Sequence, residues 1–212
     1  ISIIQNSNFN HLAVLDFPLK RYTGSINGYG GKFKLNNISI SNGKAEDQLN
    51  IVHAEIEVAQ LKVSNAVSDA FDCDFCKGTI KKIVISNSGG DGLDISGSNI
   101  EVSEMIAMNI KDKAFSVGEN SVALINDASF SSVATGIAVK DASLVRASKI
   151  SLENIAFDAF MSYVKKPFYY GNTRLEVADY NIDNYKVNKI CTREIGTDLI
   201  VNNKDCDISK ID

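Results

Sequence analysis

The chain has 212 residues, 44% of them hydrophobic, and a formal net charge of −4. It contains no Lys/Arg tract, which argues against a nucleic-acid partner, and no apolar run of about 18 residues, so no membrane span is expected. It begins with Ile1 and shows no signal peptide, so we expect a mature product or a piece of a longer chain with flanking domains.

Short β-branched segments with period-two alternation recur along the chain, and helix signals are few. In chain order the alternating pairs are Phe33/Leu35, Ile38/Ile40, Ile56/Val58, Leu61/Val63, Ile83/Ile85, Ile100/Val102 and Ile150/Leu152. Each pair is typical of a short strand with one buried face. We therefore expect one all-β domain over residues 1–212, with an irregular N-terminal coil in 1–32, regular coils in 33–162, and a loop followed by a C-terminal coil or cap in 163–212.

A repeat of 22 residues connects these strands. Asp47, Asp69 and Asp91 are 22 residues apart, and Lys113 continues the series. The residues that follow them form two apolar columns expected to point inward, the first with Leu49, Phe71, Leu93, Phe115, Ile137 and Phe160 and the second with Ile51, Cys73, Ile95, Val117 and Val139. Such a period predicts a solenoid, here a single-stranded, right-handed parallel β-helix of about seven coils with irregular capping ends.

The segment Gly89–Ser96, GGDGLDIS, resembles a calcium-binding nonapeptide of the form GGxGxDxUx. That motif binds calcium only in tandem copies, and no second GGxG follows nine residues on. The 22-residue period instead assigns this segment to one turn of the solenoid.

Asparagines recur four residues before the aspartate position. Asn65, Asn87 and Asn109 are 22 residues apart, while Asn42 and Asn154 stand at nearly the same place in their own coils. Asn tolerates the left-handed turn conformation, and stacked side-chain amides can bond one another along the axis. The spacing predicts an asparagine ladder.

An acidic cluster occupies three consecutive coils. Stacked carboxylates about 4.8 Å apart repel one another by roughly 1 kcal/mol in water, so something must offset the repulsion. One interpretation is a Ca²⁺ site, with candidate ligands Asp47, Asp69, Asp72, Asp91 and Asp94. A second is catalysis by a polysaccharide lyase or uronate epimerase, with Asp72, Asp94 and Lys113 as candidate catalytic residues. A third is that the aspartates only cap backbone N–H groups at turns.

A second candidate site is the segment YVKKPFYYG at residues 163–171. Aromatic faces stack on sugar rings and lysines bind anionic groups. The candidate substrate-binding residues are Tyr163, Lys165, Lys166, Phe168, Tyr169 and Tyr170. The same residues would also suit an end cap of the solenoid.

Four cysteines and two histidines remain. Cys73 and Cys76 form a CxxC without a second copy, and the inward column favours core packing for Cys73 over a redox or zinc pair. Cys191 and Cys206 lie in the irregular tail, and whether they are bridged stays open. His11 and His53 are expected to be isolated turn residues.

Several segments, among them AEDQLNI, SNSGGDGLDISGS, TGIAVKD and VKKPFYYG, resemble acidic right-handed β-helix segments of bacterial surface proteins. Similar segments accompany spore-coat CotH kinase-like domains or exopolysaccharide-linked modules. The resemblance implies a pectate-lyase-like superhelix and an extracellular or cell-envelope location in bacteria, and it transfers no catalytic residue.

The leading functional expectation is a module that binds or organises polysaccharide, with Ca²⁺ as a candidate stabilising ion. The alternatives are the lyase or epimerase and a purely structural stalk.

Overall fold

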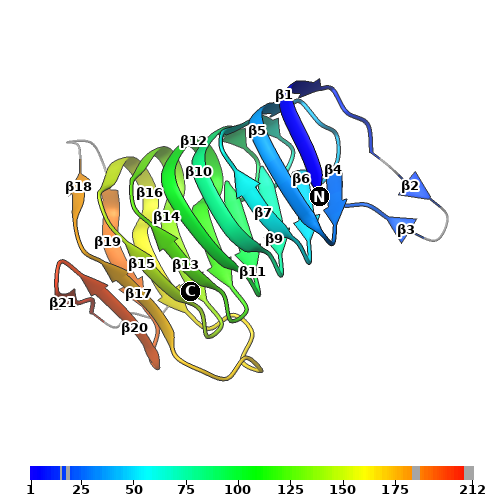
Figure 1. The fold of residues 1–212 in the computed structure, drawn as a ribbon. Coiled ribbons are helices and arrows are strands. Elements are labelled where there is room, and N and C mark those ends of the chain that lie inside the picture. Colours follow the sequence, from blue (N-terminus) through cyan, green and yellow to red (C-terminus); the bar gives the residue numbers. More distant parts are fainter. Residues whose placement is uncertain (15, 18–19, 183–186, 208–212) are drawn as a thin grey trace.

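The computed structural model describes residues 1–212 except 15, 18–19, 183–186 and 208–212, and it describes residues 16–17 and 20–21 by their backbone alone. The chain is a right-handed parallel β-solenoid of about 8 turns, which confirms the predicted fold class. Figure 1 shows the coils stacked along one axis, from the N-terminal strands to the C-terminal ones. In these described residues, no helix has the length and apolar character that a membrane span requires.

In the part of the chain that the structure describes, the strands follow one another without intervening helices. Their bounds are β1 (Ser2–Asn10), β2 (Asp16–Phe17), β3 (Lys20–Arg21), β4 (Gly24–Tyr29), β5 (Lys32–Ser41), β6 (Asp47–Val52), β7 (Glu55–Val58), β8 (Leu61–Ala66), β9 (Phe71–Asp74), β10 (Lys77–Ser88), β11 (Leu93–Ser96), β12 (Asn99–Gly118), β13 (Val122–Ile125), β14 (Ala128–Lys140), β15 (Leu144–Ala147), β16 (Ile150–Tyr163), β17 (Thr173–Val177), β18 (Tyr180–Ile182), β19 (Val187–Arg193), β20 (Thr197–Val201) and β21 (Lys204–Asp205).

The solenoid has three faces because the chain turns a corner three times per coil. One face, here called the acidic face, stacks β4, β6, β9 and β11 with the last residues of β12, β14 and β16. A second, here called the groove face, stacks the first residues of β5, β10 and β12 with β7, β13, β15, β17 and β20. The long strands β10, β12, β14 and β16 bend around corners and so contribute to more than one face.

The predicted inward columns form the core. Leu49 pairs with Phe71, which pairs with Leu93, and the column continues through Phe115 and Ile137 to Phe160 in the predicted register. Their side chains are almost fully buried. Burying an aliphatic or aromatic side chain of this size contributes roughly 1.5–3 kcal/mol, so these columns are a main source of the fold's stability.

The asparagine ladder is confirmed. The Nδ2 amide of Asn65 donates to Oδ1 of Asn42 at 2.9 Å, Asn87 donates to Asn65 at 2.9 Å, and Asn109 donates to Asn87 at 3.1 Å. Asn87 has a φ of 58°, the left-handed conformation that Asn adopts at low cost. Asn154 donates to a serine of the preceding coil rather than to another asparagine.

Close packing between coils explains the first two of the three glycines of GGDGLDIS. A Cβ on Gly89 would lie 2.0 Å from the carbonyl oxygen of Val67, and a Cβ on Gly90 would lie 2.1 Å from Oδ1 of Asp69. Neither distance allows a side chain. These glycines therefore let neighbouring coils approach, in agreement with the solenoid interpretation of the segment.

The ends are more regular than the sequence indicated. β1 pairs with β5 over nearly its whole length, and β4 already pairs with β6, so the first coil begins within the range predicted to be irregular. β2 and β3 form a small antiparallel hairpin, which extends away from the coils in Figure 1. At the other end, β21 turns back antiparallel to β20, and a disulfide joins Cys191 to Cys206.

Candidate functional site

The acidic face carries a row of polar residues in register, here called the acidic row. Asn50, Asp72, Asp94 and Ser116 occupy equivalent positions in successive coils, and Asp72 is the direct neighbour of Asp94. Ser116 is fully buried and the two aspartates are half-buried. The face is therefore less accessible to solvent than an outward-facing strand usually is.

The turn aspartates bond the backbone of the next coil. Oδ1 of Asp69 accepts the N–H of Asp91 at 2.6 Å, and Oδ1 of Asp91 accepts the N–H of Lys113 at 2.9 Å. The side chain of Asp69 occupies the space that Gly90 leaves open. For Asp69 and Asp91 this geometry agrees with the third interpretation of the acidic cluster, in which the aspartates cap backbone N–H groups at turns.

Burial perturbs the carboxyl groups of this face. Burial, together with the nearby carboxylates of Asp74 and Asp47, raises the pKa of Asp72 to about 8. Burial also raises the pKa of Asp47 to about 6, despite a hydrogen bond with Thr23. Desolvation disfavours the charged form of an acid, and adjacent like charges add to the effect. Asp72 therefore holds a proton at neutral pH.

Two lysines of the acidic face form ion pairs with different aspartates. Nζ of Lys113 lies 3.3 Å from Oδ1 of Asp91, whereas Nζ of Lys140 lies 3.8 Å from Oδ1 of Asp94 and donates to Oγ of Ser116 at 2.8 Å. The structure thus brings the candidate catalytic residues Asp72 and Asp94 together, whereas Lys113 forms ion pairs with Asp91 and Asp112. The lysine beside Asp94 is Lys140.

Three of the five candidate calcium ligands lie close enough together to bind one ion. Carboxylate oxygens of Asp69, Asp91 and Asp94 lie within 4.8 Å of one another, and the buried Oδ1 of Asp94 accepts no hydrogen bond among the described residues. Such hard oxygen donors fit Ca²⁺, which takes six to eight of them, so water would have to supply the others. Asp47 and Asp72 lie outside this group.

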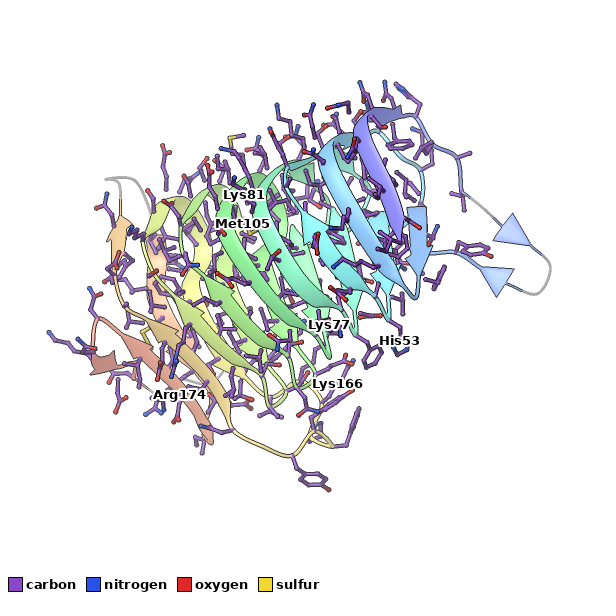
Figure 2. The ribbon with its side chains drawn as sticks, viewed as in Figure 1. His53, Lys77, Lys81, Met105, Lys166 and Arg174 are labelled. Atoms are coloured by element: carbon purple, nitrogen blue, oxygen red, sulfur yellow. A yellow bond between two sulfur atoms is a disulfide. The ribbon has the colours of Figure 1, made fainter. Side chains whose placement is uncertain are left out.

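The aromatic segment 163–171 is held against the acidic face by its polar groups. The hydroxyl of Tyr169 donates to Oε2 of Glu119 at 2.9 Å, and Lys166 forms an ion pair with the same carboxylate. The backbone N–H groups of Lys165 and Lys166 donate to Oδ1 of Asp141 at 2.7 and 2.6 Å. Figure 2 shows Lys166 at the lower edge of the coils.

The six predicted sugar-binding residues of this segment therefore differ in accessibility. Phe168 and Tyr170 are 65% and 90% exposed. Tyr163 is half-buried, and Lys166 and Tyr169 are engaged with Glu119. The exposed rings are free for a ligand, whereas the engaged groups fix the segment to the solenoid.

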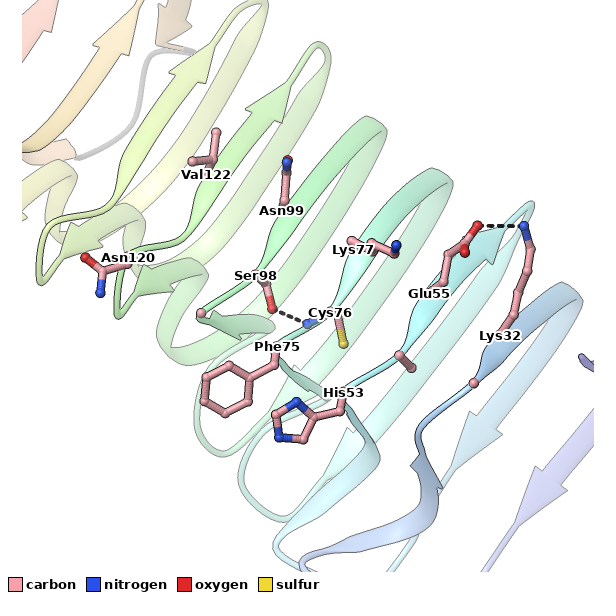
Figure 3. A pocket seen from close by; sticks show the side chains of 13 residues that line it. Lys32, His53, Glu55, Phe75, Cys76, Lys77, Ser98, Asn99, Asn120 and Val122 are labelled. Carbon is pink, nitrogen blue, oxygen red and sulfur yellow. Dashed lines mark hydrogen bonds and ion pairs between the residues drawn. The ribbon is translucent and has the colours of Figure 1, made fainter.

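A groove that sequence reasoning missed lies on the groove face, at the corner next to the acidic face (Figure 3). It has a volume of about 680 Å³. Its lining includes Gly31, His53, Phe75, Lys77, Asn99 and Asn120. The rings of His53 and Phe75 stack in parallel, with centroids 4.6 Å apart and an interplanar angle of 10°. His53 lies at a turn between β6 and β7, as expected, and the stack with Phe75 is an additional feature of that turn.

The backbone makes this ring stack possible. His53 and Phe75 both have a φ of 53°, and Phe75 lies over Gly97 of the next coil, where a Cβ would meet its ring at 2.6 Å. On the other side of His53, a Cβ on Gly31 would meet nothing within 4 Å. The outer side of the His53 ring therefore borders open space one coil away.

The turn that presents Phe75 is closed by a disulfide between Cys73 and Cys76. Both cysteines are buried in the core, as expected for Cys73, but the sequence reasoning did not foresee the bond. Ser98 reinforces the turn, since its Oγ accepts the N–H of Cys76 at 2.7 Å and donates to the carbonyl of Cys73 at 2.9 Å. Phe75 is consequently held outward on a rigid turn, 49% exposed.

The groove continues along the solenoid axis. A second hollow of about 510 Å³ shares Asn99 and Val122 with the first. Its floor carries the exposed apolar side chains Val122, Leu124 and Leu144. Arg146, Arg174 and Glu176 border its far end in a set of ion pairs.

The signal that could have found this site is the 22-residue spacing of His53, Phe75 and Gly97. The stacking of two rings and a glycine at one corner follows from the same periodicity that placed the aspartates.

Fold and site together define the chain as a parallel β-solenoid with one acidic face and one grooved face. No family of known proteins matches it by sequence. No curated protein and no solved structure matches it either.

Proposed function

We propose that this solenoid is a polysaccharide-binding module whose ligand lies in the groove face, along the solenoid axis. The observation that carries the proposal is the parallel stack of His53 and Phe75 at the rim of the groove. Sugar rings present apolar C–H faces, and flat side chains held rigidly on a surface are suited to contact them. The groove also has the volume of a small-molecule or oligomer site.

The polar residues around the ring stack suit hydroxyl groups. Lys77, Asn99 and Asn120 line the same groove, and Figure 3 shows Lys77 and Asn99 in adjacent coils on the strand side of the rings. The amides can donate and accept hydrogen bonds, and the lysine donates only. Gly31 has no side chain, and a Cβ there would meet nothing within 4 Å, so we expect a sugar ring to stack on the imidazole from that side.

The regular coil spacing favours a polymer over a single sugar. The two hollows join at Asn99 and Val122, so a chain could pass from the ring stack to the apolar floor. Repeating units would then meet equivalent positions of successive coils. A rigid, preformed groove lowers the ordering cost of binding such a chain.

The proposal includes an extracellular or cell-envelope setting. The resemblance to surface β-helix segments that accompany CotH kinase-like or exopolysaccharide-linked modules suggests this setting. The two disulfide bonds favour an oxidising compartment. Ca²⁺ at Asp69, Asp91 and Asp94 is proposed as a stabilising ion of the acidic face, outside the groove.

Affinity electrophoresis through gels containing single polysaccharides tests the proposal. We expect retardation by at least one polymer, and Phe75→Ala should abolish it because the substitution removes one of the two stacked rings. Phe157→Ala is the matched control, since Phe157 is also an exposed ring, at 61%, and lies outside the groove. Phe168→Ala examines the aromatic segment 163–171 in the same assay.

The outcomes separate the candidate functions. Loss of retardation with Phe168→Ala but not with Phe75→Ala would move the binding site to the aromatic segment. Retardation by no polymer of a broad panel would contradict polysaccharide binding and favour the structural stalk. Release of unsaturated uronate, followed by ultraviolet absorbance, would favour the lyase with Asp72 and Asp94.

A further inference from the structure

The charged side chains of the groove face are largely matched with one another. Nζ of Lys32 lies 2.7 Å from Oε1 of Glu55, an ion pair drawn in Figure 3, and Lys32 also pairs with Glu57. At the other end of the face, Nη1 of Arg174 lies 3.0 Å from Oδ2 of Asp198. An anionic ligand would therefore have to compete with carboxylates of the protein for these cations.

Two charged side chains of the hollows form no ion pair with a described residue, and their signs are opposite. They are Lys77 in the first hollow and Glu101 in the second. Even the charge of Lys77 is partly compensated, since Lys32 and, to a smaller extent, Lys77 lower the pKa of Glu55. The groove thus offers no excess of positive charge.

One outward row crosses the groove face from coil to coil. It begins with Lys32, Glu55 and Lys77 and, beyond an uncharged centre, ends with Arg174 and Asp198. The sign of the charge alternates within both ends of this row. A polymer with a negative charge on each sugar would meet carboxylates as often as cations, so its charges would gain little from binding here.

The centre of the same row is mostly apolar. Asn99 is followed by Val122 and Leu144, and Leu124 lies in the same hollow. Val122, Leu124 and Leu144 are 46%, 38% and 42% exposed. Such side chains suit the C–H faces of sugar rings, whereas a carboxylate or sulfate placed against them loses hydration without gaining a partner.

Carboxyl groups also lie beside the ring stack. Asp74 precedes Phe75 in the chain, and its carboxyl is near enough to His53 for their charges to interact. Burial, together with the carboxylates of Asp94 and Glu119, raises the pKa of Asp74. The chain as a whole has a net charge of −4. The potential at this end of the groove therefore disfavours an anionic ligand.

We propose that the polymer bound in the groove face is an uncharged polysaccharide, whose sugar rings lie with their C–H faces on the ring stack and on the apolar floor. The inference rests on the proposed function and adds the chemical class of the ligand. Lys77, Asn99 and Asn120 then bind hydroxyl groups, since the amides donate and accept hydrogen bonds and the lysine donates them.

Affinity electrophoresis with matched pairs of polymers tests this inference. The members of a pair share one backbone and differ in charge, as hydroxyethyl cellulose and carboxymethyl cellulose do, or methyl-esterified galacturonan and polygalacturonate. Mobility is measured relative to a reference protein of similar net charge. In at least one pair the uncharged member should bind at least about tenfold more tightly. Its dissociation constant should change less than about twofold between about 0.05 and about 0.5 M NaCl, because salt screens charges.

Two substitutions of opposite charge at one position sharpen the test. Leu124→Glu and Leu124→Lys each place a charge on the apolar floor. Both should weaken binding of the uncharged polymer by about fivefold or more, since either charge loses hydration when a sugar covers it. Ser129→Glu is the matched control, with a charge at an exposed position of β14 outside the groove, and should leave binding unchanged.

Circular dichroism should show native strand content for all three variants, and the polymer pairs decide should a Leu124 variant fail to fold. Tighter binding of the charged members, lost at high salt and strengthened by Leu124→Lys, would overturn the inference and leave polysaccharide binding in the groove intact. Equal binding of both members of every pair would also overturn it. Retardation by no polymer, charged or uncharged, would overturn the proposed function and this inference with it.

Discussion

The proton held by Asp72 gives a prediction about stability. Its pKa rises from 3.8 to about 8 on folding, chiefly because the carboxyl is buried and because Asp74 and Asp47 lie nearby. The folded state therefore retains a proton that the unfolded chain releases above about pH 4. The contribution of Asp72 to the free energy of unfolding is most favourable below that pH and is lost as the pH rises through about 8.

Each pKa unit corresponds to 1.36 kcal/mol, so the full shift sets an upper limit of about 6 kcal/mol. The neighbouring carboxyls titrate together with Asp72, and water can enter the acidic row. We therefore expect a contribution of about 2 kcal/mol to the free energy of unfolding. Asp72→Asn resembles the protonated acid in shape and cannot ionise. Between about pH 5 and about pH 9, the variant should lose less unfolding free energy than the wild type by that amount.

Urea unfolding at the two pH values measures the difference. Asp127→Asn serves as the control, because Asp127 is an exposed aspartate outside the acidic row and its substitution should leave the pH dependence unchanged. Parallel loss of stability in the wild type and in Asp72→Asn would refute the reasoning, since it would mean that Asp72 is ionised in the folded protein.

Two further predictions concern the acidic face and the ladder. Ca²⁺ at ten times its dissociation constant should stabilise the fold by about 1.4 kcal/mol and so raise the melting temperature. Asp94→Asn should remove this rise, whereas the control Asp127→Asn should keep it. A melting temperature that changes with neither Ca²⁺ nor EDTA would count against the ion. Asn87→Ala should lower the free energy of unfolding by about 2–3 kcal/mol, because two hydrogen bonds between side-chain amides are lost and Ala is strained at a φ of 58°. Asn87→Gly, which relieves the strain alone, should cost less in the same denaturation assay, and equal losses would show that the backbone conformation contributes nothing.

The periodicity of the sequence was sufficient for the fold because a solenoid repeats one local arrangement. The inward column from Leu49 to Phe160 and the amide ladder through Asn87 both follow from residue type and spacing, and both are confirmed. The ends were harder to predict, since β1 and β4 lack the aspartate that marked the register elsewhere.

The candidate site was less predictable because it depends on side-chain directions at corners. Spacing alone placed Asp72 next to Asp94, but it could not show that Lys113 turns to Asp91 and Lys140 to Asp94. The ring stack of His53 and Phe75 requires left-handed backbone conformations at two non-glycine residues. Left-handed conformations are uncommon in residues other than glycine, so the 22-residue spacing of His53 and Phe75 did not by itself reveal the ring stack.

Polysaccharide binding in the groove face is tested most directly by an NMR titration of the protein with an oligosaccharide of the polymer that binds best. We expect the largest changes in chemical shift at His53, Phe75, Lys77 and Asn99, with further changes along the groove face toward Val122. Changes confined to the segment 163–171 or to the acidic row, with the signals of His53 and Phe75 unmoved, would contradict it.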